Sequence, residues 1–174
     1  MKDKKLNHIT VVVLVDFHGH SVAGNEEMQS SRYSALKALA FNGDSSPVIF
    51  VCNTYPNEDR DGGAALKELE RMIRVDRKHK WYWVDPDDGS ASIDNIKSII
   101  EKDGYSIGNI IIGGCNLAGC VTHSKAISAI KWVQKGYNTE IFLPMCGEYQ
   151  MPGKTNMEII LHAFTHMYRE IQKS

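Results

Sequence analysis

The segment that most constrains the fold is a short, valine-rich apolar run near the start of the chain, from Ile9 to Asp16. A strand that is apolar on both faces is typical of the centre of a parallel sheet, where helices cover both sides. Positive charges precede this run, as they do in a secretory signal. However, the run is short and ends on an acid, with no small-residue cleavage site. It is therefore predicted to be a buried strand.

Similar runs recur along the chain and alternate with segments of helical spacing. Further strands are predicted at residues 47–52, 80–84, 109–114 and 139–143, and helices at 26–41, 64–75, 93–104, 121–135 and 157–171. This alternation indicates parallel strands joined by helical crossovers. We predict one domain over residues 1–174, a Rossmann-like three-layer α/β/α sandwich with a mostly parallel sheet of five or six strands.

The charge balance and the cysteine spacing exclude several classes of protein. Lys and Arg number 20 against 21 Asp and Glu, a net charge of −1, which is not the basic footprint of a nucleic-acid-binding protein. No apolar run approaches the roughly 20 residues of a membrane span. The four cysteines show no spacing typical of a small secreted scaffold. We predict a cytoplasmic protein with free thiols that binds neither nucleic acid nor membranes.

Functional groups in such a sheet gather where the strands end and the next helices begin. Cys115 and Cys120 follow the pair Gly113-Gly114 and precede a predicted helix. The amino end of a helix favours a thiolate, and its free N–H groups can hold an oxyanion. Asp16 ends the first strand and could orient or deprotonate a nucleophile on a neighbouring strand. Either cysteine is a candidate nucleophile.

Histidines near the first strand are candidates for the walls of a substrate pocket. His18 and His20 alternate along an extended segment, so they point the same way and suit a metal ion. The next strand, however, ends in residues 53–56, Asn-Thr-Tyr-Pro, which supply no further acid or histidine ligand. We therefore predict no metal, and we assign His18, His20 and Tyr55 to the substrate pocket.

Other basic residues have simpler interpretations. Lys78 and His79 are predicted to form a solvated basic turn before an aromatic strand. His162 and His166 lie four residues apart on the last helix, a spacing that suits a metal. No acid or thiol accompanies them in the sequence, so a surface pair is predicted.

Several motifs together resemble one known family. They are VVVLVDF at 11–17, which contains Asp16, PVIFVCN at 47–53, NIIIGG at 109–114 with a loop reaching Cys120-Val121, Lys135-Gly136-Tyr137 before a strand, and Met145-Cys146-Gly147. The last is similar to an Asp-Ala-Cys-Gly segment. Over its whole length the chain resembles the isochorismatase-like cysteine hydrolases, which include nicotinamidases and other small-amide hydrolases.

The resemblance implies a catalytic triad of aspartate, lysine and cysteine. Cys120 would attack the substrate carbonyl and Asp16 would accept its proton. Lys80, with Lys78 as the alternative, would assist. A second alignment, shifted by about one helical turn, puts Ser124 in the place of the nucleophile.

The resemblance also implies an oxyanion hole built from the backbone N–H groups of Asn116 and Cys120. These would lie beside a cis peptide at Cys115–Asn116. The expected substrate is a small amide or a related carbonyl compound, the enzyme needs no cofactor, and the chain is expected to form a homo-oligomer.

Two other functions are left open. In caspase-like peptidases a strand ends in His-Gly and the next ends in a cysteine, which His18-Gly19 and Cys115 match locally, although an extra pair of strands lies between them. Alternatively, the chain is a non-catalytic domain of the same fold that binds a small molecule or a protein. Rapid alkylation of Cys120 would favour the hydrolase, of Cys115 the peptidase, and inert thiols the binding domain.

Overall fold

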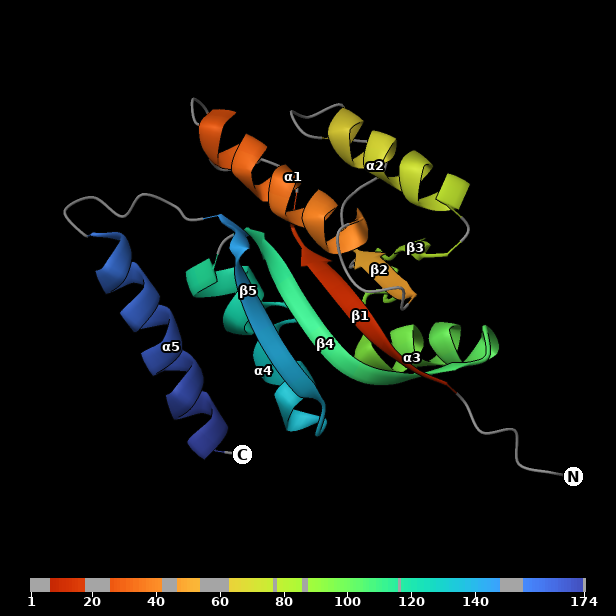
Figure 1. The fold of residues 1–174 in the computed structure, drawn as a ribbon. Coiled ribbons are helices and arrows are strands. Elements are labelled where there is room, and N and C mark those ends of the chain that lie inside the picture. The colour runs from red at the N-terminus through yellow and green to blue at the C-terminus, as the bar shows by residue number, and fades with distance from the viewer. Residues whose placement is uncertain are drawn as a thin grey trace, which may run out of the picture.

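A parallel sheet forms the centre of the protein. The computed structural model describes residues 7–17, 26–41, 47–53, 63–76, 78–85, 88–115, 117–147 and 155–173. All strand pairs in the sheet are parallel, and the order is β3-β2-β1-β4-β5 (Figure 1). The strands are β1 (Asn7–Val15), β2 (Val48–Cys52), β3 (Lys80–Trp83), β4 (Tyr105–Cys115) and β5 (Asn138–Gly147). The predicted α/β class is confirmed, and of the five or six mostly parallel strands predicted, the described residues form five, all of them parallel.

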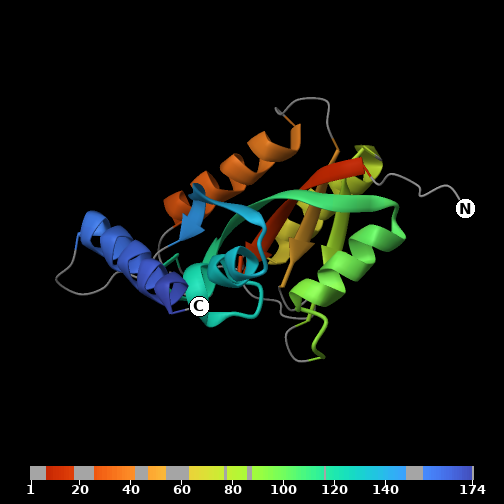
Figure 2. The ribbon, with the colours of Figure 1, turned by 90° about the horizontal axis from the view of Figure 1, so that it is seen from below.

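Helices cover both faces of this sheet. On one face lie α1 (Glu26–Phe41) and α2 (Gly63–Asp76). On the other lie α3 (Ile93–Lys102), α4 (Ala129–Gln134), α5 (Asn156–Gln172) and a π-helix, η1 (Leu117–Ser124), as Figures 1 and 2 show. A hydrophobic core lies on each face of the sheet, and successive residues of β1 pack alternately in one core and the other. Val11 and Val13 belong to the core under α3 and η1, whereas Val12 and Leu14 belong to the core under α1 and α2. The predicted three-layer arrangement is therefore observed.

The carboxyl end of β4 approaches β1 closely enough to require glycine. Gly114 has φ +147°, and a Cβ placed on it would lie 1.7 Å from the carbonyl oxygen of Val15. A Cβ on Gly113 would lie 2.6 Å from the Cβ of Met145 on β5. The two glycines thus let three neighbouring strands pack tightly where β1 gives way to Asp16.

The helix predicted over residues 121–135 is wrong in its bounds, because two elements occupy this region. The π-helix η1 already begins at Leu117, directly beyond β4, and ends at Ser124. Residues 125–128 interrupt the helix, and Ser128, in an extended conformation, precedes α4. The buried Trp132 fixes the second piece, since its indole N–H donates to the carbonyl of Ile127 at 3.1 Å.

Two further predictions need correction. β5 continues to Gly147 instead of ending at Leu143, so Met145 lies inside the strand. Pro144, which has no backbone N–H, is tolerated there because β5 is an edge strand. On the outer side of an edge strand the backbone N–H groups have no neighbouring strand to bind. His79 is not solvated. It is buried, and its Nδ1 accepts a hydrogen bond from the backbone N–H of Val48 at 3.0 Å, which ties β3 to the start of β2.

Across the described segments, no helix has both the length and the apolar character that crossing a bilayer requires.

Candidate active site

Asp16 lies at the carboxyl end of the central strand β1 in a strained conformation. Its φ is +45°, in the left-handed region, which is uncommon for residues other than glycine. Asp tolerates this region better than most residues, but holding it there still costs roughly 1 kcal/mol or more. Outliers of this kind cluster at functional sites, where the surroundings hold them in place.

Asn53, which follows β2, supplies that support. The backbone N–H of Asp16 donates to Asn53 Oδ1 at 2.6 Å, and Asn53 Nδ2 donates to Asp16 Oδ1 at 3.2 Å. Asn53 is only 1% exposed, and its own backbone N–H donates to the carbonyl of Leu14 at 3.1 Å. One buried amide thus fixes both the backbone and the carboxylate of Asp16.

Lys125 completes the contacts of this carboxylate. Its Nζ lies 3.2 Å from Asp16 Oδ2, and both side chains are partly buried. Lys125 directly follows η1, in the interruption before α4. The two carboxylate oxygens of Asp16 therefore face different partners, the amide of Asn53 on one side and a cation on the other.

Cys120 lies in the middle of η1, five residues before Lys125. It is half-buried and packs against the core that contains Val15 and Val121. η1 is a π-helix, whose turns join residues five apart, and Lys125 lies just beyond its last residue, Ser124. Such turns are often found at functional sites. The sulfur, the cation and the carboxylate are thus carried by adjoining segments at one edge of the sheet.

Arg32 fixes the chain immediately beyond Asp16. This residue of α1 is 2% exposed, and its Nη2 donates to the carbonyl of Phe17 at 2.9 Å. The guanidinium also lies over the Phe17 ring, 4.5 Å from its centroid. A buried cation that contacts both the ring and the backbone of Phe17 restrains the residue that directly follows Asp16.

Lys80, the predicted catalytic lysine, is not brought near Asp16. It is the first residue of β3 and pairs in register with Ile49, which in turn pairs with Val11. At about 3.3 Å per residue, Val11 lies roughly 16 Å before Asp16 along β1. Lys80 instead forms an ion pair with Asp103 beyond the end of α3. Lys80 therefore lies toward the amino ends of the strands, whereas Asp16 lies at their carboxyl ends. The lysine that contacts Asp16 is Lys125.

The remaining predicted site residues are only partly described. Cys115 ends β4 and pairs in register with Gly147, but its side chain, like His18, His20, Tyr55 and Asn116, lies outside the described residues. Lys78, the alternative lysine, lies two residues before Lys80 and so is near the same end of β3.

Histidines meet where α5 packs on η1. The rings of His123 and His166 stack with centroids 4.0 Å apart, and His123 Nδ1 lies 2.9 Å from Thr122 Oγ1. Burial lowers the pKa of His123, and the nearby His166 lowers it further. His162 is exposed as predicted, whereas His166 is partly buried. No three acidic, histidine or cysteine side chains among the described residues could hold a metal ion together.

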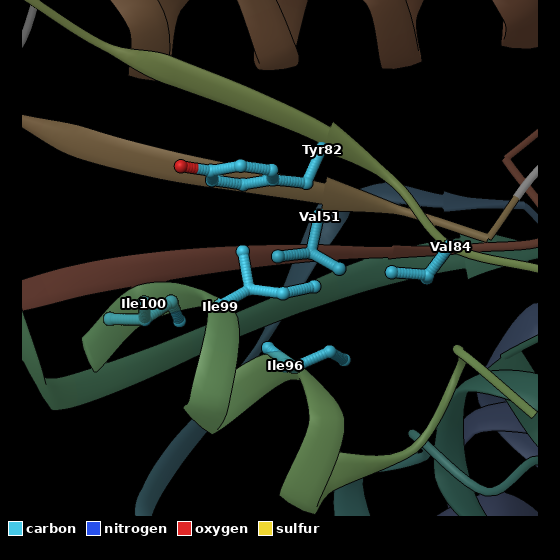
Figure 3. A pocket seen from close by; sticks show the side chains of 6 residues that line it. All are labelled: Val51, Tyr82, Val84, Ile96, Ile99 and Ile100. Carbon is cyan, nitrogen blue, oxygen red and sulfur yellow. The ribbon is translucent and has the colours of Figure 1, made fainter. Parts of the chain in front are cut away.

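A hollow between β3 and α3 is a packing gap and not a binding site. It is lined by Val51, Tyr82, Val84, Ile96, Ile99 and Ile100 (Figure 3). Its one side-chain polar group is the Tyr82 hydroxyl, which donates to Asp103. Burial, followed by this hydrogen bond, raises the pKa of Tyr82. The lining contains nothing that would bind or activate a polar substrate.

Asn53, Lys125 and Arg32 were not identified as site residues from the sequence. For Asn53 a signal exists, because it directly follows a predicted strand. Lys125 and Arg32 lie within predicted helices, and their roles depend on which helix packs against which strand end.

No known family model matches this chain, and no curated protein or solved structure matches it.

Proposed function

We propose that this protein is a cytoplasmic cysteine hydrolase that cleaves a small amide or a related carbonyl compound. Cys120 is the nucleophile, Asp16 its base, and Lys125 takes the part first assigned to Lys80. The observation that carries this proposal is the placement of the Asp16 carboxylate between Asn53 and Lys125, at the strand edge from which η1 begins.

Each group has a distinct step in this reaction. The thiol proton of Cys120 passes to Asp16, and the sulfur attacks the carbonyl carbon. Backbone N–H groups at the start of η1 stabilise the oxyanion. The amine leaves with the proton from Asp16, which gives a thioester. Water, deprotonated by Asp16, then attacks the thioester and releases the acid and the thiol. Throughout, the Lys125 ammonium offsets the negative charge on the carboxylate and the sulfur.

One observation favours a second candidate. Strands β1 and β4 are direct neighbours, with Val15 opposite Gly114. The two strands that lie between β1 and β4 in the sequence, β2 and β3, therefore do not lie between them in the sheet. A caspase-like peptidase with these two residues is the alternative proposal, and identification of the reactive cysteine distinguishes the two.

The first experiment needs no knowledge of the substrate. The protein is treated briefly with iodoacetamide over a range of pH, and the modified cysteines are quantified by peptide mass spectrometry. We expect Cys120 to react fastest, with the half-buried Cys146 as the internal reference. Lys125→Gln should slow the modification of Cys120 by about tenfold, because a nearby cation favours the thiolate, whereas Lys80→Gln should not.

Activity is then measured as amine or ammonia release from a panel of small amides. In the variant Cys120→Ala turnover should fall by about 10³-fold or more, and in Asp16→Asn by about 10²-fold to 10⁴-fold. Cys146→Ala is the matched control and should keep wild-type turnover. Full activity in Cys120→Ala would refute the assignment of the nucleophile, and fastest labelling of Cys115 would favour the peptidase.

A further inference from the structure

Four of the eight exposed large apolar side chains among the described residues belong to α5. This helix lies at the outer end of the molecule (Figures 1 and 2). Its exposed apolar residues are Met157 at 63%, Leu161 at 58%, Phe164 at 36% and Tyr168 at 64%. The inner side of the helix is occupied separately, since Ile159 and Ala163 are buried against the rest of the fold. A helix that is apolar on two sides needs a second partner.

The four exposed residues follow the spacing of a helix that packs on another helix. Steps of four, three and four residues separate them, which is the alternation of a and d positions in a heptad. Together they form one stripe along α5, which we name the outer stripe. This spacing fits a straight apolar partner helix of similar length.

We infer that the outer stripe is a dimer interface that pairs with the outer stripe of a second copy of this chain, with the two α5 helices antiparallel. A two-fold axis through Phe164 places Leu161 against the second copy's Tyr168, and the reverse. Such an interface is self-complementary and closes after two copies.

The charges beside the outer stripe favour this arrangement. Glu158 and Arg169 lie about three turns apart on the same flank of α5, and both are exposed. The two-fold axis through Phe164 brings Glu158 of each copy opposite Arg169 of the other. An antiparallel pair also sets the positive amino end of one helix beside the negative carboxyl end of its partner.

Sedimentation velocity over about 1–100 µM protein tests self-association with dissociation constants in the micromolar range. Leu161→Glu should raise the dissociation constant of the dimer by at least about tenfold, because it places a carboxylate in an apolar contact. Val75→Glu is the matched control. Val75 is 72% exposed on α2, away from the outer stripe, and its substitution should leave association unchanged.

Cysteine cross-linking tests the direction of the helices. In Phe164→Cys the two new thiols would meet at the axis, so mild oxidation should give a covalent dimer. In Met157→Cys they would lie about 21 Å apart, at about 1.5 Å per residue, and should not cross-link. Wild type corrects for the native cysteines. A wild-type protein that is monomeric at 100 µM, or equal cross-linking of both variants, would overturn the inference.

Discussion

The contact between Asn53 and Asp16 is the part of the site whose energetic contribution follows most directly from the structure. Asn53→Ala removes two hydrogen bonds, one to a carboxylate and one to a backbone N–H. A hydrogen bond to a charged group contributes about 1.5–3 kcal/mol and a neutral one about 0.5–1.5 kcal/mol. Because Asn53 is buried, water does not replace these partners easily. We expect the free energy of unfolding to fall by about 2–4 kcal/mol.

Urea unfolding followed by tryptophan fluorescence measures this loss. With a slope of about 2 kcal/mol per molar urea, the midpoint should fall by about 1–2 M. The matched control is Asn138→Ala. Its Nδ2 donates to Asn109 Oδ1 at 2.9 Å, but this pair is exposed, so its removal should change stability by less than about 0.5 kcal/mol.

A double-mutant cycle separates the contact from other effects of truncation. Asp16→Ala, Asn53→Ala and the double variant should give a coupling energy of about 1–3 kcal/mol. If Asn53→Ala destabilises the protein no more than Asn138→Ala does, or if the two substitutions are additive, then Asn53 does not hold Asp16 in place. The left-handed conformation of Asp16 would then need another cause.

Two other perturbations test the fold around the site. Gly114→Ala should prevent stable folding, since its Cβ would overlap the Val15 carbonyl. Gly136→Ala, at φ +84° with open space around it, should cost only about 1 kcal/mol; equal melting temperatures would refute the close approach of β4 and β1. For His123, the folded-state pKa lies below the ordinary 6.5, so the unfolded chain binds more protons as the pH falls. Wild type should therefore lose stability from about pH 6.5 downward, and His123→Gln should show a shallower pH dependence in thermal melts; identical slopes would contradict the burial of this ring against His166, with His162 and Glu170 nearby.

Much of the fold follows from local patterns in the sequence. The valine-rich run predicts β1 because a strand apolar on both faces has no other stable place than the middle of a covered sheet. The helix predicted at 26–41 matches the bounds of α1. The extension of β5 through Pro144 was missed, because only the position of β5 at the edge of the sheet makes that proline acceptable. The interruption at 125–128 was missed as well, since the helical spacing continues across it.

The choice of Lys80 illustrates a different kind of error. The resemblance to a family suggested this residue, although Lys80 begins a predicted strand. In a parallel sheet all strands begin at one end and finish at the other. The first residue of a strand, such as Lys80, therefore lies at the end opposite to a residue that follows a strand, such as Asp16. The rule that selected Asp16 therefore already argued against Lys80. Lys125 carries no such signal, because its approach to Asp16 depends on the interruption after η1.

Two local departures from regular structure coincide at this edge of the sheet. Asp16 adopts a left-handed conformation, and the helix beside it is a π-helix instead of an α-helix. Each conformation is less stable than its regular alternative. An α-helix through residues 117–135 would direct Lys125 elsewhere, and an extended Asp16 would leave the reach of Asn53. Both departures bring partners to the same group, the carboxylate of Asp16. For this reason we locate the chemistry of this protein at Asp16 and not in the apolar hollow beside α3.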